Sequence, residues 1–209
     1  MKTILCYGDS NTFGYRPDNG MRFDRDTRWP GRLQSLLGDD YYVVEEGCNG
    51  RTTLFEEAGE EWKSGMTYLR PCLNSHKPLD LLIIMLGSND LKNMFGADAQ
   101  TVAKGVDEII RVSREFLMDK QGFAPEILLI SPPLIGENIA ETAFRDRFES
   151  SAHERSKGFA GALRAVAEAH GCRFLDAAEH VKASDIDCLH LEAEGHRALA
   201  DAVYEEICR

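Results

Sequence analysis

The stretch Leu81-Leu82-Ile83-Ile84-Met85 is apolar at every position, and Ile127-Leu128-Leu129-Ile130 repeats this pattern further along the chain. A strand with one face in water alternates apolar and polar residues, whereas a parallel strand covered by helices on both faces is apolar throughout. The two runs therefore predict buried strands of a doubly wound α/β fold.

Three more short apolar runs extend the pattern in both directions, with helical periodicity between them. We predict strands at 3–7, 41–46, 79–86, 126–131 and 173–176, and helices at 29–37, 66–74, 98–117, 159–170 and 193–207. Strands that alternate with helices along a chain usually form a parallel sheet. The expected fold is thus a three-layer α/β/α sandwich with a five-stranded parallel sheet of flavodoxin-like architecture, in a single domain over residues 1–209.

The charge balance limits the classes of partner. The chain has 35 acidic against 24 basic residues and a formal net charge of -11, so we expect no binding to nucleic acid or to an anionic membrane surface. The first predicted strand begins at residue 3, which leaves no room for a signal peptide, and no apolar run is long enough for a transmembrane helix. These features predict a cytoplasmic protein.

The six cysteines give no indication of a disulfide framework or a metal site. They are scattered without a Cys-x-x-Cys pair or a zinc-type Cys/His spacing, at Cys6, Cys48, Cys72, Cys172, Cys188 and Cys208. A chain of 209 residues buries a full core without cross-links. We expect reduced cysteines that pack in the interior, no metal and no cofactor.

The loops that follow four of the predicted strands carry polar side chains. Parallel strands deliver their carboxyl ends to one edge of the sheet, where ligands of such folds bind. Three of these loops directly follow a predicted strand, and the fourth ends just before the last predicted helix. They are Gly8-Asp9-Ser10-Asn11, Gly47-Cys48-Asn49-Gly50-Arg51-Thr52-Thr53, Gly87-Ser88-Asn89-Asp90, and Asp187-Cys188-Leu189-His190. The site is predicted where these loops meet.

Ser10 is a candidate nucleophile because it stands where a buried strand ends. A serine hydroxyl needs a base to accept its proton, and the Asp187-x-x-His190 pair offers an imidazole with a carboxylate to fix its tautomer. Gly-Asp-Ser taken alone is also an ordinary turn. The other five histidines stand in polar or helical contexts that exposure or a helix end explains: His76, His153, His170, His180 and His196.

Two further residues offer donors for an oxyanion. Asn89 carries a side-chain amide, and Gly50 has a backbone N–H that a substrate can approach closely because no side chain intervenes. Each residue is also common in a simple turn. Their joint placement with Ser10 and His190 favours the catalytic interpretation.

In this order, Gly8-Asp9-Ser10, Gly50, Asn89 and Asp187-x-x-His190 resemble the motifs of the SGNH, or GDSL-type, hydrolase superfamily. The resemblance spans residues 8 to 190. It implies the SGNH hydrolase fold, with Ser10 as nucleophile, His190 as base and Asp187 as the acid that orients it. It also implies an oxyanion hole formed by the amides of Ser10 and Gly50 with the side chain of Asn89.

Further segments are similar to the arylesterase and acyltransferase branch of that superfamily: Glu45-Glu46-Gly47, Arg51-Thr52-Thr53, Ile84-Met85-Leu86-Gly87 and Asn89-Asp90. The chain departs from the pattern at three positions. Asn11 replaces the leucine of the GDSL motif, Cys188 stands where a glycine often follows the acid, and Glu192 stands where Thr or Ser would usually cap the last helix. None of these departures removes a catalytic group.

The resulting hypothesis is a serine esterase that hydrolyses short-chain aryl or alkyl esters through an acyl-enzyme, with acyl transfer to alcohols as a further expectation. The alternatives are a carbohydrate O-acetylesterase and, from another class, a noncatalytic ligand-binding module on the same fold. No Gly-x-Ser-x-Gly elbow, dinucleotide fingerprint or phosphate-binding loop supports another reading.

We expect the substrate pocket to be a narrow apolar channel beside Ser10. Its predicted lining comes from residues of the strand-end loops: Asn11, Phe13, Tyr15, Met94, Phe95, Leu134, Ile135 and Leu189. The segment 15–29 mixes aromatic residues with arginines, a composition enriched at subunit contacts. Together with the resemblance, this segment predicts a homo-oligomer that acts on a small-molecule ester.

Overall fold

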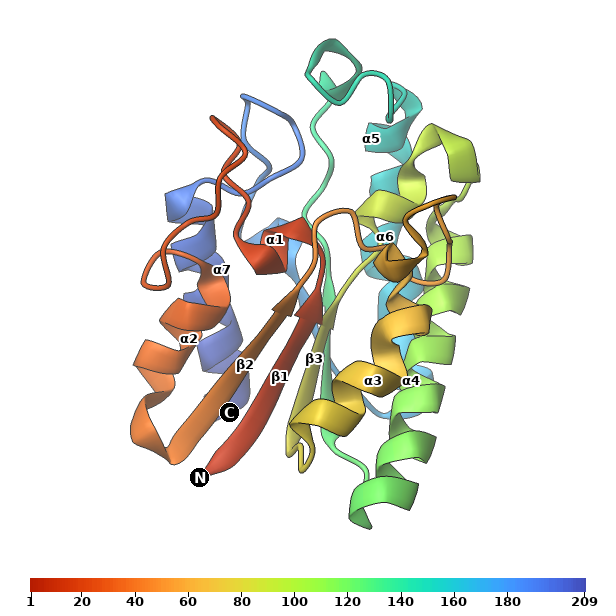
Figure 1. The fold of residues 1–209 in the computed structure, drawn as a ribbon. Helices are drawn as coiled ribbons and strands as arrows, with labels where there is room; N and C mark the ends of the chain where they lie inside the picture. Colours follow the sequence, from red (N-terminus) through yellow and green to blue (C-terminus); the bar gives the residue numbers. More distant parts are fainter.

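The computed structural model describes residues 1–209 and contains one five-stranded parallel sheet (Figure 1). The strands are β1 (Lys2–Gly8), β2 (Tyr41–Gly47), β3 (Leu81–Met85), β4 (Glu126–Ser131) and β5 (Arg173–Asp176), in the spatial order β2-β1-β3-β4-β5. All four strand pairs are parallel. The predicted fold class is confirmed.

Helices cover both faces of the sheet. They are α1 (Ser10–Phe13), α2 (Trp29–Leu37), α3 (Gly65–His76), α4 (Ala99–Gln121), α5 (Ser151–Ser156), α6 (Phe159–His170) and α7 (Ala193–Cys208). In Figure 1, α2 and α7 lie on one side of the sheet, and α3, α4 and α6 lie on the other. Each side has its own apolar core cluster, so every strand contributes side chains to two cores.

The strand pattern explains the double coverage. Leu82 and Ile84 of β3 point into the cluster under α3, α4 and α6, while Ile83 and Met85 point into the cluster under α2 and α7. Since side chains alternate between the faces of a strand, a strand buried on both faces must be apolar at consecutive positions.

The predicted helix ends lie within a few residues of the observed ones. Capping interactions explain where several helices begin and end. Ser64 caps α3 and Asp98 caps α4, each through a side chain that accepts a hydrogen bond from a backbone N–H three residues on. Gly122 ends α4 at φ 85° and Gly171 ends α6 at φ 60°, the left-handed conformation that glycine adopts without strain. The two short helices α1 and α5 are not predicted, because four and six residues show no periodicity.

None of the helices combines the length and the apolar composition needed to cross a lipid bilayer. All six cysteines are free thiols, as predicted, and three of them are fully or almost fully buried. The carboxyl ends of the strands meet at one edge of the sheet, at the top of Figure 1, and the loops that leave this edge build the candidate site.

Candidate active site

A cavity of about 410 Å³ opens at the carboxyl edge of the sheet. Its walls come from all four loops singled out in the sequence and from the loop after β4: Ser10, Tyr15, Asn49, Gly50, Glu60, Trp62, Lys63, Asn89, Lys92, Ala143, Phe144, Arg147, Phe148, Leu189 and His190. Four of the five residues predicted to be catalytic or to form the oxyanion hole therefore line one cavity. The fifth, Asp187, is buried behind His190.

Ser10 is the first residue of α1 and is held by the turn that leaves β1. The side chain of Asp9 caps α1 by accepting a hydrogen bond from the N–H of Asn11 at 2.9 Å. Gly8 is required by close packing, because a Cβ there would lie 2.1 Å from the Oγ1 of Thr12. The short strand-to-helix turn thus presents the Ser10 hydroxyl at the cavity floor.

His190 links Ser10 to Asp187. The Nε2 of His190 lies 2.8 Å from the Oγ of Ser10, and its Nδ1 lies 2.6 Å from Oδ2 of Asp187. The other carboxylate oxygen of Asp187 accepts hydrogen bonds from the backbone N–H groups of Leu189 and His190. With Nδ1 protonated toward the carboxylate, Nε2 is free to accept the serine proton.

The environment of Asp187 keeps its carboxylate charged. Burial on its own raises the pKa, but the hydrogen bond and charge of His190 together with the two backbone N–H groups outweigh it, and the pKa of Asp187 lies below its ordinary value. A charged Asp187 supports the imidazolium that forms when His190 takes a proton.

Three side chains fix the His190 ring and its loop. The ring of Tyr15 lies against the imidazole with centroids 4.2 Å apart, and Phe144 approaches from another side at 5.5 Å. Asn11 donates a hydrogen bond to the carbonyl of Leu189 and accepts one from the N–H of Leu191. The position that departs from the GDSL motif therefore clamps both neighbours of His190.

Three N–H donors near Ser10 have no acceptor within the protein: the backbone amides of Ser10 and Gly50 and the side-chain amide of Asn89. Gly50 adopts φ 80°, a conformation that favours glycine, and a Cβ there would crowd the side chain of Lys63 at 3.2 Å. Unpaired donors directed at one cavity suit an anionic oxygen.

Buried polar contacts hold the loops that carry Gly50 and Asn89 in place. Arg51 donates hydrogen bonds to the carbonyls of Gly8 and Glu46 and lies 4.3 Å from the centre of the Tyr7 ring. Asp90 accepts hydrogen bonds from the N–H and the hydroxyl of Thr53. These contacts tie the loop that carries Gly50 to the end of β1 and to the loop that carries Asn89.

Charged side chains form part of the outer wall of the cavity. Lys92 is only 2% exposed and donates to Glu57 at 2.9 Å, while Lys63 pairs with Glu60. Arg147 is exposed at the same wall and forms no ion pair with the protein. The predicted narrow apolar channel describes only part of the cavity, because lysine, arginine and glutamate side chains line it together with aromatic ones.

Of the eight predicted pocket residues, Tyr15 and Leu189 line the cavity and six do not. Ile135 is buried in the core, and the exposed Met94 points elsewhere; Phe13 lies under the guanidinium of Arg22 and Phe95 stacks on Phe55. Leu134 is half-buried outside the cavity and Asn11 is buried beneath it. A position in a strand-end loop does not determine which way a side chain points.

Several cavity residues were not predicted from the sequence, among them Trp62, Lys63, Lys92, Phe144 and Arg147. Lys92 follows Asn89 by three residues, and Trp62 and Lys63 end the long loop after β2. The rule that strand-end loops meet at one edge indicated these segments, but no local motif marks the individual positions.

Two of the residues that depart from the pattern of the superfamily have structural consequences. Cys188 is the only non-glycine residue with a positive φ, at 59°, which explains the preference for glycine after the acid. Glu192 forms no side-chain cap on α7, and its carboxylate instead accepts a hydrogen bond from the hydroxyl of Ser184 at 2.7 Å.

Two expectations need correction. His196 is not exposed, since it is fully buried in the first turn of α7 next to α2. The expectation that no cluster of potential metal ligands exists is also wrong: the ligand atoms of Glu46, Cys72 and His76 lie within 4.8 Å of one another. The spacing Cys72-x-x-x-His76, one helical turn, is the signal that was missed.

Comparison with known proteins gives consistent matches. A sequence model described as the GDSL-like Lipase/Acylhydrolase family matches residues 6–198. The chain is 27% identical over 146 residues to an acetylxylan esterase of Xylanibacter ruminicola, a match that covers 62% of this chain and 28% of that protein. The chain therefore spans little more than a quarter of that curated relative.

Two solved structures resemble the whole chain. One is a carbohydrate acetylesterase family member from Sinorhizobium meliloti, with 36% identity, a TM-score of 0.92 and coverage of 99% of this chain and 97% of that chain. The other is the native aryl esterase of M. smegmatis, with 32% identity, a TM-score of 0.92 and coverage of 100% and 99%.

Proposed function

The chain belongs to the GDSL-like lipase/acylhydrolase family, and we propose that it hydrolyses short-chain aryl or alkyl esters through an acyl-enzyme on Ser10. Membership confirms the enzyme class predicted from the sequence, a carboxylic ester hydrolase. The observation that carries the proposal is the unbroken chain of contacts from Ser10 Oγ through His190 to Asp187, at 2.8 and 2.6 Å.

In the first step, Ser10 attacks the ester carbonyl while its proton moves to Nε2 of His190. The imidazolium is stabilised by the charged carboxylate of Asp187, which lies within hydrogen-bond distance of Nδ1. The tetrahedral intermediate carries a negative oxygen, and we expect the N–H donors of Ser10, Gly50 and Asn89, which line the same cavity, to stabilise it.

Collapse of this intermediate breaks the bond to the alcohol, which leaves with the proton held by His190, and Ser10 remains acylated. In the second half of the cycle, His190 takes a proton from water, the water oxygen attacks the acyl carbonyl, and Ser10 regains its proton as the acid leaves. No other nucleophilic group is needed for this sequence.

The size and walls of the cavity support a small acyl group. A volume of about 410 Å³ holds a small substrate, and the buried ion pairs around Lys92 and Glu57 make one wall unsuited to a long acyl chain. Tyr15, Phe144 and Leu189 supply an apolar side next to His190, where a short acyl or aryl group finds contact.

A second candidate is a carbohydrate O-acetylesterase. Trp62 is 54% exposed at the cavity, and Glu60, Lys63 and Asn49 line the wall beside it. An exposed indole ring surrounded by polar groups suits the face of a sugar ring, and two of the similar proteins are named for carbohydrate or xylan acetyl esters.

Acyl transfer to an alcohol is the third part of the proposal. The acyl-enzyme partitions between water and an alcohol according to how well each is bound and oriented. Because charged groups form much of the wall, we expect transfer only to alcohols that fit the apolar side formed by Tyr15 and Phe144, with hydrolysis dominant in water.

The central test is Ser10→Ala with nitrophenyl acetate as substrate and a fluorophosphonate as covalent probe. Loss of the nucleophile should lower kcat by about 10⁴- to 10⁶-fold and abolish labelling, while circular dichroism stays unchanged. The matched control is Ser131→Ala, since Ser131 is an equally buried serine at the end of β4. Turnover retained in Ser10→Ala, or lost equally in Ser131→Ala, would contradict the assignment.

A further inference from the structure

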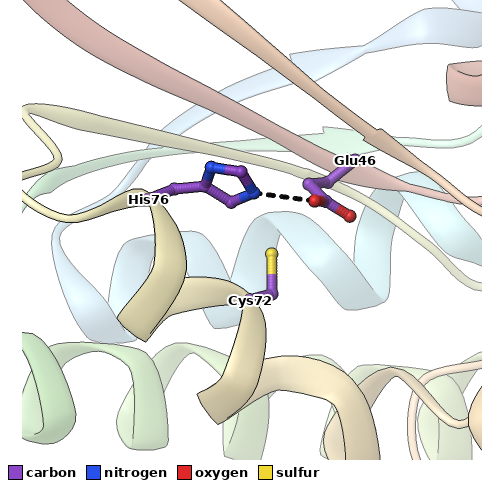
Figure 2. Close-up of side chains that lie close together, drawn as sticks. All are labelled: Glu46, Cys72 and His76. Carbon is purple, nitrogen blue, oxygen red and sulfur yellow. Dashed lines mark hydrogen bonds and ion pairs between the residues drawn. The ribbon is translucent and has the colours of Figure 1, made fainter.

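A second cluster of reactive side chains lies away from the active-site cavity, between β2 and α3. Glu46 comes from β2, and Cys72 and His76 come from α3 (Figure 2). None of the three lines the cavity that contains Ser10. Residues four apart on a helix share one face, so Cys72 and His76 are both directed at the strand that carries Glu46.

The three ligand atoms converge. The Nε2 of His76 lies 2.8 Å from Oε1 of Glu46, as Figure 2 shows, and the Sγ of Cys72 completes a triangle whose sides are all within 4.8 Å. Once the thiol and the Nε2 of the imidazole have lost their protons, all three groups can donate a lone pair to a metal ion. A thiol, an imidazole and a carboxylate gathered in this way are the ligand types of a zinc site.

We propose that Glu46, Cys72 and His76 bind one Zn²⁺ ion as a three-residue site with a fourth position open to water. Zn²⁺ takes thiolate, imidazole and carboxylate ligands in tetrahedral geometry. The sulfur ligand distinguishes this site from one for Mg²⁺ or Ca²⁺, which select oxygen ligands only.

The required movement is small. Zinc bonds of about 2.0 to 2.3 Å place tetrahedral ligand atoms about 3.3 to 3.6 Å apart. The imidazole and the carboxylate must therefore separate slightly, and the sulfur must approach by about 1 Å, which rotations of side chains achieve. The backbones of β2 and α3 need not move.

Charge balance also favours a divalent ion. On binding, the ion displaces the proton of the Cys72 thiol, which passes to solvent, and the hydrogen bond between His76 and Glu46 is replaced by two metal bonds. The thiolate and the carboxylate together neutralise the ion. Burial and the negative charge of Glu46 raise the pKa of the Cys72 thiol, and the positive charge of Arg51 partly opposes that rise.

The ion has a path to the site. The side chains of Glu46 and His76 are 19% and 29% exposed, while Cys72 lies fully buried beneath them. The hydrated ion meets the imidazole and carboxylate first and then the sulfur.

The bound ion would cross-link β2 to α3 and so stabilise the fold near the oxyanion loop. The carbonyl of Glu46 accepts a hydrogen bond from Arg51, the residue after Gly50. Stabilisation by a ligand that binds only the folded state grows with its free concentration, by about 2.7 kcal/mol at 100 times Kd. The role is structural, and ester hydrolysis does not depend on it.

The test uses Co²⁺ as a spectroscopic substitute for Zn²⁺, with the full chain purified without a histidine tag. We expect one Co²⁺ per chain with a sulfur-to-cobalt charge-transfer band in the near ultraviolet, competed away by Zn²⁺. Cys72→Ser should remove the band, and His76→Ala or Glu46→Gln should weaken Zn²⁺ binding more than about tenfold. Zn²⁺ should raise the Tm of the wild type only.

A matched control comes from the same chain. His170 and Asp107 form a comparable pair at 2.7 Å without a cysteine ligand, so His170→Ala should leave metal binding unchanged. Cys48→Ser and Cys208→Ser exclude binding by the more accessible thiols. A Co²⁺ band that survives Cys72→Ser, or Zn²⁺ affinity unchanged in both His76→Ala and Glu46→Gln, would overturn the proposal.

If Cys72→Ser fails to fold, the partly exposed positions Glu46 and His76 still decide the question. Binding of Zn²⁺ is measured by calorimetry in the presence of a competing chelator of known affinity. Activity toward nitrophenyl acetate, followed in parallel, should be equal with and without Zn²⁺, so the outcome is independent of the proposed esterase function.

Discussion

The side-chain oxygen of Asn11 accepts a hydrogen bond from the backbone N–H of Leu191 at 2.9 Å, across 180 residues of sequence. The amide nitrogen of the same side chain donates to the carbonyl of Leu189. His190 lies between these two residues, so the side chain next to Ser10 in sequence fixes the loop that carries His190. The two hydrogen bonds of Asn11 therefore help to fix the distance between Oγ of Ser10 and Nε2 of His190.

Asn11→Ala should lower kcat about tenfold to a hundredfold with little change in KM, because the His190 loop loses both bonds and the proton transfer is misaligned while substrate contacts remain. Asn11→Asp keeps an acceptor for the N–H of Leu191 and should recover part of the rate. The readout is steady-state kinetics on nitrophenyl acetate. A loss that appears only in KM, or equal rates in both variants and the wild type, would show that Asn11 does not position the base.

Asn89→Ala should lower kcat by about a hundredfold to a thousandfold, the usual consequence of removing one oxyanion donor. The side-chain amide of Asn89 has no protein acceptor and lines the cavity. Asn49→Ala is the control, since Asn49 lines the same cavity next to Gly50. Equal effects of the two substitutions would argue against a specific role for Asn89 in stabilising the transition state.

The sequence predicts the fold well because two separate features indicate each strand. Apolar runs such as Leu82 to Met85 show burial on both faces, and the polar turn after each run shows where it ends. The residues brought together at the edge of the sheet follow from topology alone, since parallel strands share one carboxyl edge. This rule predicts that Ser10 and His190 lie close together, although 180 residues separate them in the sequence.

The pocket could not be predicted in the same way. Met94 and Phe95 follow Asn89 by five and six residues and Lys92 follows it by three, yet only Lys92 turns into the cavity. Side-chain direction in an irregular loop depends on tertiary packing, here the stacking of Phe95 on Phe55 and the ion pair of Lys92 with Glu57. No period of 2 or 3.6 residues exists in such a loop to reveal it.

Trp62→Ala should discriminate between the two proposed substrate classes. If the indole ring stacks on a sugar, its removal costs about 0.5 to 1.5 kcal/mol, and kcat/KM for an acetylated xylo-oligosaccharide falls roughly threefold to tenfold. The value for nitrophenyl acetate should stay unchanged. Trp62→Phe, which retains an aromatic face, should lie between the two. Equal losses on both esters would remove the support for a carbohydrate substrate.

Assembly is a further prediction. Three arginines of the segment 15–29 gather around the single carboxylate of Glu45 in the same chain, so their positive charge exceeds its negative charge: Arg22, Arg25 and Arg28. Met21 of that segment is 66% exposed and remains available for a contact with a second copy. We expect a homo-oligomer in light scattering at micromolar concentration and a monomer for Met21→Asp. A monomeric wild type would refute the prediction.

His196 makes stability fall in acid. It is fully buried between α7 and α2, where its Nδ1 accepts a hydrogen bond from the N–H of Trp29 at 3.4 Å. Burial, with a smaller contribution from the charge of His190, lowers the pKa of His196 to about 3. The folded state therefore keeps it neutral, whereas the unfolded chain protonates it near pH 6.5.

The sign of the pH dependence follows from this difference. Below pH 6.5 the unfolded state binds one more proton, so the free energy of unfolding falls by about 1.4 kcal/mol per pH unit down to about pH 3. His196→Asn keeps an oxygen acceptor for Trp29 but has no titrating group. We expect the difference in the free energy of unfolding between wild type and variant to shift by about 2 to 3 kcal/mol in favour of the variant between pH 7 and 4.5.

Urea denaturation at both pH values measures this shift. Burial also raises the pKa of Asp9 to about 6 and that of Asp90 to about 7. These carboxyls change the free energy of unfolding with the opposite sign. Their pKa is higher in the folded state, so the stabilisation they give is present at low pH and is lost as the pH rises from the unfolded-state pKa to the folded-state pKa. Both are present in wild type and variant, so their contribution cancels in the difference. His180→Asn, at an exposed position, should show no shift, and stability curves of wild type and His196→Asn that run parallel from pH 7 to 4.5 would mean that His196 does not cause the acid sensitivity.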